Sequence, residues 1–178
     1  MRFCLLRLVL YPDPVLRRRA VPLETIDDSV RDRVREMFET MYEERGVGLA
    51  APQVGWSVRL FIVNTSAEPD EPELDRVYIN PQLSRPTEDD DATDTDEEGC
   101  LSIPGVRGKV LRPDRVVVRA LDLDGKPFEE EVDGLHARVV QHEFDHLDGI
   151  LFISRLSATE RLLANKILKQ LEREYKRG

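Results

Sequence analysis

The sequence lacks the features that mark membrane proteins and nucleic-acid-binding proteins. No apolar run approaches the roughly 18 residues of a membrane span, and 34% of the residues are charged. Basic residues form no extended cluster beyond the three arginines at 17–19. These absences, together with an apolar content of 40%, favour a soluble globular protein with no membrane segment and no direct nucleic-acid site.

Cysteine is also scarce, with only Cys4 and Cys100 in the chain. The apolar N-terminal stretch is interrupted by Arg7, and no small-residue cleavage site follows, so we expect no signal peptide. The sequence therefore favours a cytoplasmic protein, in which thiols stay reduced. Cys4, within the apolar stretch, is expected to be a small buried residue, whereas Cys100 is a candidate ligand or nucleophile.

The net charge of −9 arises almost entirely from one segment. Residues 88–98 hold eight acidic residues and no basic one, so the rest of the chain carries a net charge of only −1. We interpret this segment as a solvated loop. A calcium site is the alternative, but the segment lacks the alternating ligands and central glycine of a calcium-binding loop.

The chain length predicts one domain over residues 1–178, and hydrophobic periodicity predicts three helices in it. Apolar residues recur at spacings of three and four over residues 27–44, 135–147 and 157–176, as on amphipathic helices. The glycine-rich stretch at 48–55 is expected to be a tight loop.

Short β-branched or alternating runs between these helices predict strands, at residues 58–64, 76–79, 106–111, 115–122 and 128–132. An Asp-Gly-Lys-Pro sequence before the last run favours a hairpin. Strands and helices do not alternate as in a βαβ protein. The expected fold is therefore α+β, with mixed, mainly antiparallel sheets surrounding a central helix, an N-terminal helix and a long C-terminal helix.

The most informative motif is His142-Glu143-Phe144-Asp145-His146, in the expected central helix. Residues four apart lie on one face of a helix, so the two imidazoles can bind the same metal ion. Glu143 then lies where its carboxylate can take a proton from a metal-bound water. This pattern predicts a metal-binding helix and indicates a hydrolase. The alternative is a polar, solvated helix face that carries two histidines by chance.

A catalytic metal site usually has about three protein ligands and a water, so a third ligand is expected. In thermolysin-like proteases a glutamate downstream of the histidines supplies it. Here Cys100, within Glu-Glu-Gly-Cys-Leu-Ser-Ile-Pro at 97–104, is the stronger candidate. A thiolate suits a soft or borderline metal and is deprotonated on binding.

Three motifs together resemble the peptide deformylase family over nearly the whole chain. They are GVGLAAPQVG at 46–55, EEGCLSIP at 97–104 and QHEFDH at 141–146. The C-terminal helix is similar to that of the bacterial type I branch. The resemblance implies a metal-dependent hydrolase that removes the N-formyl group from the N-terminal methionine of newly synthesised peptides and releases formate.

The same resemblance implies a metal site and a partner. Cys100, His142 and His146 would hold one divalent metal ion, with Fe²⁺ as the native ion and Zn²⁺, Ni²⁺ or Co²⁺ as possible substitutes. The partners would be N-formylmethionyl nascent peptides, met at the ribosome.

It also implies roles for residues around the metal. Glu143 would act as general base and then as general acid, and the Gln53 side-chain amide and the Leu101 N–H would form the oxyanion hole. Taken alone, Gln53 is better interpreted as a surface amide. Leu101 and Val139 are alternatively core residues, and both of their roles can hold at once. The substrate cleft would be lined by Val47, Gly48, Gly99, Leu135 and Val139.

Other polar residues near the motifs have two interpretations. Asp145 either orients a ligating imidazole or is a surface acid. Arg107 is either a charge at the cleft mouth or an exposed strand residue. His136 is expected at the cleft edge rather than at the metal. His136 and Arg138 stand where many relatives carry aliphatic residues. The resemblance therefore does not determine the local shape of the cleft.

Two other functions remain possible on the sequence alone. One is a metallopeptidase that cleaves internal peptide bonds and has its third ligand downstream of His146. The other is a metal-stabilised module that binds formylated N-termini without turnover.

Overall fold

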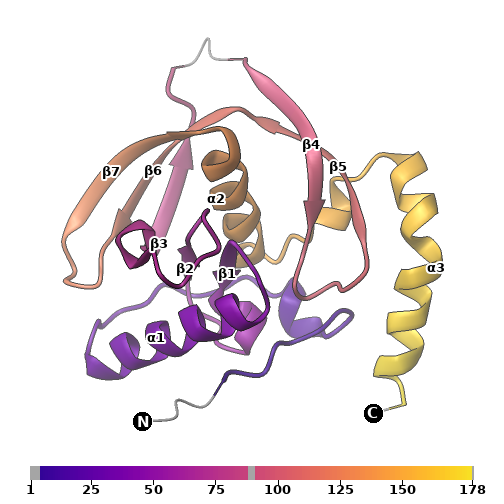
Figure 1. Ribbon diagram of the computed structural model, residues 1–178, viewed down its shortest axis with the longest axis horizontal. Coiled ribbons are helices and arrows are strands. Elements are labelled where there is room, and N and C mark those ends of the chain that lie inside the picture. The colour runs from indigo at the N-terminus through magenta and orange to yellow at the C-terminus, as the bar shows by residue number, and fades with distance from the viewer. Residues whose placement is uncertain (1–4, 88–90, 178) are drawn as a thin grey trace.

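The computed structural model describes residues 5–87 and 91–177, and it places two sheets around one central helix (Figure 1). Cys4 lies outside these residues. The described α-helices are Asp28–Glu43 (α1), Gly134–Leu147 (α2) and Ala158–Tyr175 (α3). The described strands are Gly48–Ala50 (β1), Leu60–Val63 (β2), Arg76–Ser84 (β3), Thr93–Gly99 (β4), Arg107–Pro113 (β5), Arg115–Leu121 (β6) and Pro127–Asp133 (β7). Short 3₁₀ turns are Pro14–Arg17 (η1), Ala51–Val54 (η2), Pro72–Leu74 (η3) and Phe152–Ser154 (η4).

Both sheets are antiparallel. The larger has five strands in the order β1-β2-β3-β6-β7, and the smaller is the β4–β5 pair. The β6–β7 pair is the hairpin that the Asp-Gly-Lys-Pro sequence predicts. An isolated parallel bridge joins Val21 to Val58. The α+β fold predicted from the sequence is confirmed.

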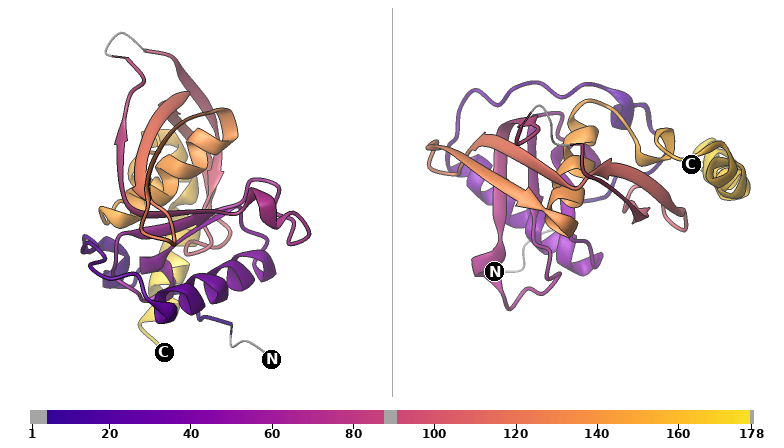
Figure 2. Two further views of the ribbon diagram at one scale, coloured as in Figure 1. Left: turned by 90° about the vertical axis from the view of Figure 1, so that its left-hand side faces the viewer. Right: turned by 90° about the horizontal axis from the view of Figure 1, so that it is seen from above.

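Alternation along β2 explains how the five-stranded sheet lies between two helices. Phe61 and Val63 belong to the apolar cluster that includes residues of α2, whereas Leu60 and Ile62 belong to the cluster that includes residues of α1. Successive side chains of a strand point to opposite faces, so one strand supplies both cores. As a result α2 lies on one face of the sheet and α1 on the other (Figures 1 and 2).

The β4–β5 pair lies on the other side of α2, so the central helix is enclosed between the two sheets (Figure 1). The third helix, α3, packs along β5 at the edge of the molecule, with Ala164 and Leu168 buried against Val106 and Val110 (Figure 2). Ser157 caps its start by accepting a hydrogen bond from the Glu160 N–H. No helix in the described part of the chain is both long and apolar enough to span a bilayer.

Two sequence predictions about local structure are wrong. Residues 48–55 are not wholly a loop, because β1 pairs with β2 before the chain enters η2. Residues 93–98 of the acidic segment are not a solvated loop either, since they belong to β4, which pairs with β5. Residues 88–90 of that segment lie outside the described chain. The side chains of β4 are exposed except at Glu98, so the strand has no apolar alternation that the sequence could reveal.

Candidate active site

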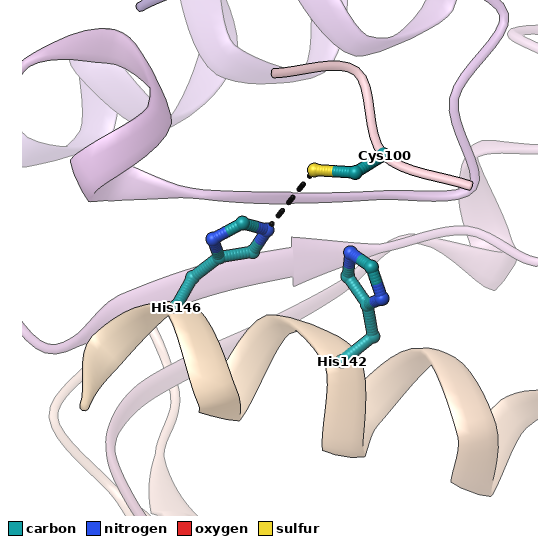
Figure 3. A group of neighbouring side chains, drawn as sticks. All are labelled: Cys100, His142 and His146. Atoms are coloured by element: carbon teal, nitrogen blue, oxygen red, sulfur yellow. Dashed lines mark hydrogen bonds between the residues drawn. The ribbon is translucent and has the colours of Figure 1, made fainter. Parts of the chain in front are cut away.

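The three predicted metal ligands come together between the β4–β5 pair and α2. Cys100 follows the last residue of β4 directly, and His142 and His146 lie one turn apart on α2. Their ligand atoms all lie within 4.8 Å of one another, and Cys100 Sγ is 3.3 Å from His146 Nε2. Figure 3 shows both imidazoles on the side of the helix that faces the thiol. The structure therefore brings together residues 46 positions apart in the sequence.

The two histidines differ in their electrostatic surroundings. Burial, together with the nearby His142 and Arg112, lowers the pKa of His146 well below its usual value, which keeps this imidazole neutral. Burial alone would lower the pKa of His142 too, but hydrogen bonds to Cys100 and Glu98 outweigh it and raise the pKa to about 10. The negative groups around His142 thus favour a positive charge at this place, whether a proton or a bound cation.

The donor set fits a divalent transition metal. Thiolate and imidazole are the donors that suit zinc and iron-group ions. Glu143 Oε2 and His146 Nδ1 are buried and have no hydrogen-bond partner among residues 5–87 and 91–177. Buried polar atoms in native proteins normally form a hydrogen bond. A buried polar atom without one, next to the thiol and the two imidazoles, indicates a site that receives a ligand.

Glu98 is the residue of this site that the sequence analysis missed. It is buried, and its Oε2 lies 3.0 Å from Nδ1 of His142. Burial would raise the pKa of Glu98, but hydrogen bonds from Arg112 and His142 outweigh it and lower the pKa to about 2. An ionised carboxylate only accepts hydrogen bonds, so Nδ1 of His142 donates and its Nε2 lone pair is left for the metal side.

Glu98 also holds two buried arginines. Arg112 donates to it through Nε and Nη2, at 2.6 and 2.9 Å, and Arg138 donates through Nη1 at 2.9 Å. Arg112 continues to Asp145 at 2.9 Å, and Asp145 also binds Arg155. The sequence offered two roles for Asp145, and neither is found. Within the described residues its carboxylate makes no hydrogen bond to an imidazole, and it is buried in this ion-pair network, not a surface acid.

Glu143 lies beside the ligands, and one face of it is pressed against Gly48. Glu143 is 4% exposed, and burial raises the pKa of its carboxyl group to about 7. A methyl group added at Gly48 would lie 2.7 Å from Glu143 Oε1 and 2.7 Å from a Val139 methyl group. Only a residue without a side chain fits here, so Gly48 sets how closely β1 approaches the face of α2 that carries Glu143.

The Gln53 side chain is buried and fixed at both ends. Its Oε1 accepts the Ala50 N–H at 2.8 Å, and its Nε2 lies 3.2 Å from Ser102 Oγ and 3.6 Å from Cys100 Sγ. The interpretation of Gln53 as a surface amide is therefore wrong. Leu101 is half-buried, and its backbone N–H makes no hydrogen bond within the described residues.

A cleft of about 550 Å³ opens onto these groups. Its lining includes Cys100, Leu101, His142 and Glu143, and also every residue that the sequence analysis assigned to the substrate cleft: Val47, Gly48, Gly99, Leu135 and Val139. Gln53 and His146 lie behind this surface and do not line it.

The structure also shows where Arg107 and His136 lie relative to the cleft. Arg107 lines the cleft and also pairs, exposed, with Glu97 at 3.3 Å, so both of its interpretations apply. His136 does not line the cleft, because its ring is turned to the Tyr78 hydroxyl at 2.9 Å. Among the described residues, the group that could hold a metal ion consists of Cys100, His142 and His146, and no acid downstream of His146 belongs to it.

Comparisons with known proteins agree on one family. A family model described as polypeptide deformylase matches residues 5–162. The peptide deformylase of Pseudomonas aeruginosa is 46% identical over 172 residues, which cover 97% of each chain. That of Chromobacterium violaceum is 45% identical over 96% of this chain and 98% of the relative.

Solved structures give the same result. Plasmodium falciparum peptide deformylase superposes with a TM-score of 0.91 at 40% identity, covering 96% of this chain and 97% of that one. The Legionella pneumophila enzyme superposes with a TM-score of 0.85 at 40% identity, covering 98% and 99%.

Proposed function

The chain belongs to the peptide deformylase family, and we propose that Cys100, His142 and His146 are the ligands of its catalytic metal ion. The reaction is hydrolysis of the N-formyl group of nascent peptides. The observation that carries the site assignment is that the three donors lie within 4.8 Å of one another, beside a buried glutamate in the wall of a cleft.

We propose Fe²⁺ as the native ion, with Zn²⁺, Ni²⁺ or Co²⁺ as substitutes. A donor set of one thiolate and two imidazoles is compatible with each of them. When bound, such an ion lowers the pKa of a water molecule to about 7 and polarises a carbonyl, so that water can attack a formamide at neutral pH.

Glu143 is the proton carrier in this proposal. Its pKa, raised by burial to about 7, suits a group that must first accept a proton from water and then give it to the departing amine. Its Oε2 has no other hydrogen-bond partner within the described residues, so it is free for that exchange.

Gln53 and Leu101 are the proposed oxyanion donors. The Gln53 amide is held by Ala50 and Ser102, which keeps Nε2 close to Cys100, and the Leu101 N–H follows that cysteine in the chain. Each fixed donor aimed at the developing negative charge would contribute roughly 3 kcal/mol to transition-state stabilisation.

The substrate's methionine is proposed to lie in the cleft that Val47, Gly48, Gly99, Leu135 and Val139 help to line. The glycines leave room for the peptide backbone. The apolar side chains offer a surface for an unbranched thioether side chain.

We further propose that residues 1–178 act as one catalytic domain in the cytoplasm, with the substrate met at the ribosome. A reducing compartment keeps Cys100 available as a thiolate ligand. Leu162 and Leu163, which are 72% and 71% exposed on α3, offer a surface away from the cleft for contact with a larger assembly.

The experiment that tests the mechanism is formate release from formyl-Met-Ala-Ser by the metal-loaded protein. Glu143→Ala should retain the metal and the fold but lose turnover by roughly 100-fold or more, because a general base is removed. Glu174→Ala, an exposed change on α3, is the matched control and should behave as the unaltered protein. Near-normal turnover by Glu143→Ala would refute its role.

The ligand assignment is tested separately with Cys100→Ser. We expect weaker metal binding or a different metal preference, because a neutral hydroxyl replaces a thiolate. Unchanged affinity and an unchanged metal spectrum would remove Cys100 from the ligand set.

A further inference from the structure

The ligands of the metal site come from two separate parts of the fold. His142 and His146 lie on α2, which is packed against the five-stranded sheet. Cys100 follows β4, which pairs only with β5 in a two-stranded sheet. A two-stranded pair is marginally stable by itself, so the distance between the thiolate and the imidazoles depends on what fastens β4 to the helix.

Apolar packing does little to fasten β4. Every residue of this strand is exposed except Glu98, so the strand buries no apolar side chain against α2. The direct attachment of β4 to α2 must therefore be polar, and it involves the backbone of β4 as well as its one buried side chain.

Arg138 supplies much of this attachment. Its Nη1 donates to Glu98 Oε1 and to the Val110 carbonyl, both at 2.9 Å. Its Nη2 donates to the Asp94 carbonyl at 3.0 Å and to the Asp94 carboxylate at 3.1 Å. One guanidinium thus binds four acceptors, three of them on β4 and one on β5, and the residue is only 7% exposed.

The position of Arg138 on the helix links this attachment to the metal site. It precedes His142 by four residues and His146 by eight, so the three side chains follow one another along the same face of α2. The planar fork of an arginine fixes direction as well as distance, which the point charge of a lysine does not.

We propose that Arg138 is a positioning residue of the metal site, which fastens the Cys100-bearing strand to the histidine-bearing helix and so sets the thiolate-to-imidazole geometry. This inference rests on the metal site proposed above. Within the described residues the Arg138 guanidinium makes no hydrogen bond to the three ligands, and it acts through Glu98, Asp94 and the backbone of the β4–β5 pair.

The test uses Co²⁺ as the metal, because its bond to a thiolate gives a charge-transfer absorption. Arg138→Met keeps the apolar stem and removes all donors. We expect it to bind Co²⁺ roughly 10-fold or more weakly, as is typical when residues that support metal ligands are changed, and to alter the charge-transfer band. Arg138→Lys should give a smaller loss in affinity, because one ammonium group cannot reach all four acceptors.

The matched control is Arg59→Met. Arg59 is also largely buried and also fastens α2, through the Leu147 carbonyl and Asp148, but it does not contact β4. We expect this variant to lose stability while keeping the Co²⁺ affinity and spectrum. Thermal unfolding of the metal-free proteins compares the two stability losses.

The outcomes separate the positioning role from the metal site itself. If Arg138→Met and Arg138→Lys bind Co²⁺ like the unaltered protein, or if Arg59→Met weakens binding equally, Arg138 has no positioning role. If Arg138→Met does not fold, Arg138→Lys decides between these results. If the unaltered protein gives no thiolate-to-cobalt band, both the site and this inference are refuted.

Discussion

Glu98 and His142 are in direct contact beside the proposed metal site, with the carboxylate 3.0 Å from Nδ1 of the imidazole. The carboxylate is held in place from its other side by Arg112, which donates to both oxygens. Nδ1 of His142 is therefore held as a donor to Glu98, a residue that lies two positions before Cys100 in the sequence, and Nε2 is the nitrogen left to bind a cation in place of its proton.

We predict that Glu98→Gln lowers both stability and metal affinity. The change removes the carboxylate that both Arg112 and Arg138 bind and leaves Arg112 with Asp145 alone, and breaking a buried ion pair costs about 3 to 5 kcal/mol. It also removes the charge that holds the His142 proton on Nδ1, so metal affinity should fall by roughly 10-fold or more. Urea unfolding of the metal-free protein and competition with a chelator measure the two effects.

Glu97→Gln is the control for this prediction, because the neighbouring side chain is 56% exposed and pairs only with Arg107. An exposed pair of this kind contributes about 0 to 1 kcal/mol, so its loss should be small. If both variants lost the same stability and affinity, burial of Glu98 would have no part in the site.

The sequence predicted the parts of this site that local patterns encode. The two histidines are identified by their spacing of four residues on an amphipathic helix, and Cys100 is identified by the motif at 97–104. The helices follow from apolar periodicity, and their ends lie within two residues of the predicted bounds. Such patterns can be recognised in the sequence because each depends only on residues within one or two helical turns.

What the sequence did not show depends on contacts between distant residues. Glu98 lies in a run of acids, and nothing in that run distinguishes it from its exposed neighbours. It is buried because Arg112, Arg138 and His142 come from other elements to meet it. Strand β4 was missed for the same reason, since its backbone pairs with β5 while its side chains stay in solvent.

We predict that Gly48→Ala lowers the turnover number without removing the metal. The new methyl group would lie 2.7 Å from Glu143 Oε1 and would push this carboxylate out of place. Displacement of a catalytic group by about 1 Å can cost roughly 100-fold in rate. Formate release at saturating substrate, alongside the metal content of each preparation, measures the effect.

Gly99→Ala provides the comparison on the opposite side of the cleft. A methyl group there would come no closer than 3.6 Å to its nearest neighbour, an ordinary contact. We expect this variant to retain more of the turnover number than Gly48→Ala. A loss of equal size in both would show that any added bulk in the cleft matters, and not the contact with Glu143.

We predict that His136 makes stability fall as the pH falls. Burial lowers the pKa of His136 below its usual 6.5, while Glu130 and Asp133 act to raise it and Arg76 to lower it. A folded-state pKa below the unfolded value means that the unfolded chain binds more protons, so stability is retained above about pH 6.5 and lost as the pH falls towards the folded pKa.

His136→Gln tests this prediction, because glutamine cannot titrate. Urea unfolding of both proteins at several pH values between about 5 and 8 spans the titration of an ordinary histidine. The stability advantage of the unaltered protein over the variant should shrink as the pH falls. A difference that stayed constant, or that grew in acid, would contradict the prediction.

We predict that Gly149→Ala destabilises the protein more than Gly134→Ala, although both glycines are in the left-handed region, with φ of 71° just beyond the end of α2 and 52° at its first residue. In that region a side chain costs roughly 1 to 2 kcal/mol. At Gly134 nothing lies within 4 Å of an added methyl group, so only this strain applies. At Gly149 the methyl group would also lie 2.5 Å from the Arg17 carbonyl oxygen, which belongs to the backbone and cannot rotate away. Urea unfolding of both variants should therefore show a larger loss in the free energy of unfolding for Gly149→Ala. Equal losses would mean that the segment around Arg17 moves aside at little cost in free energy.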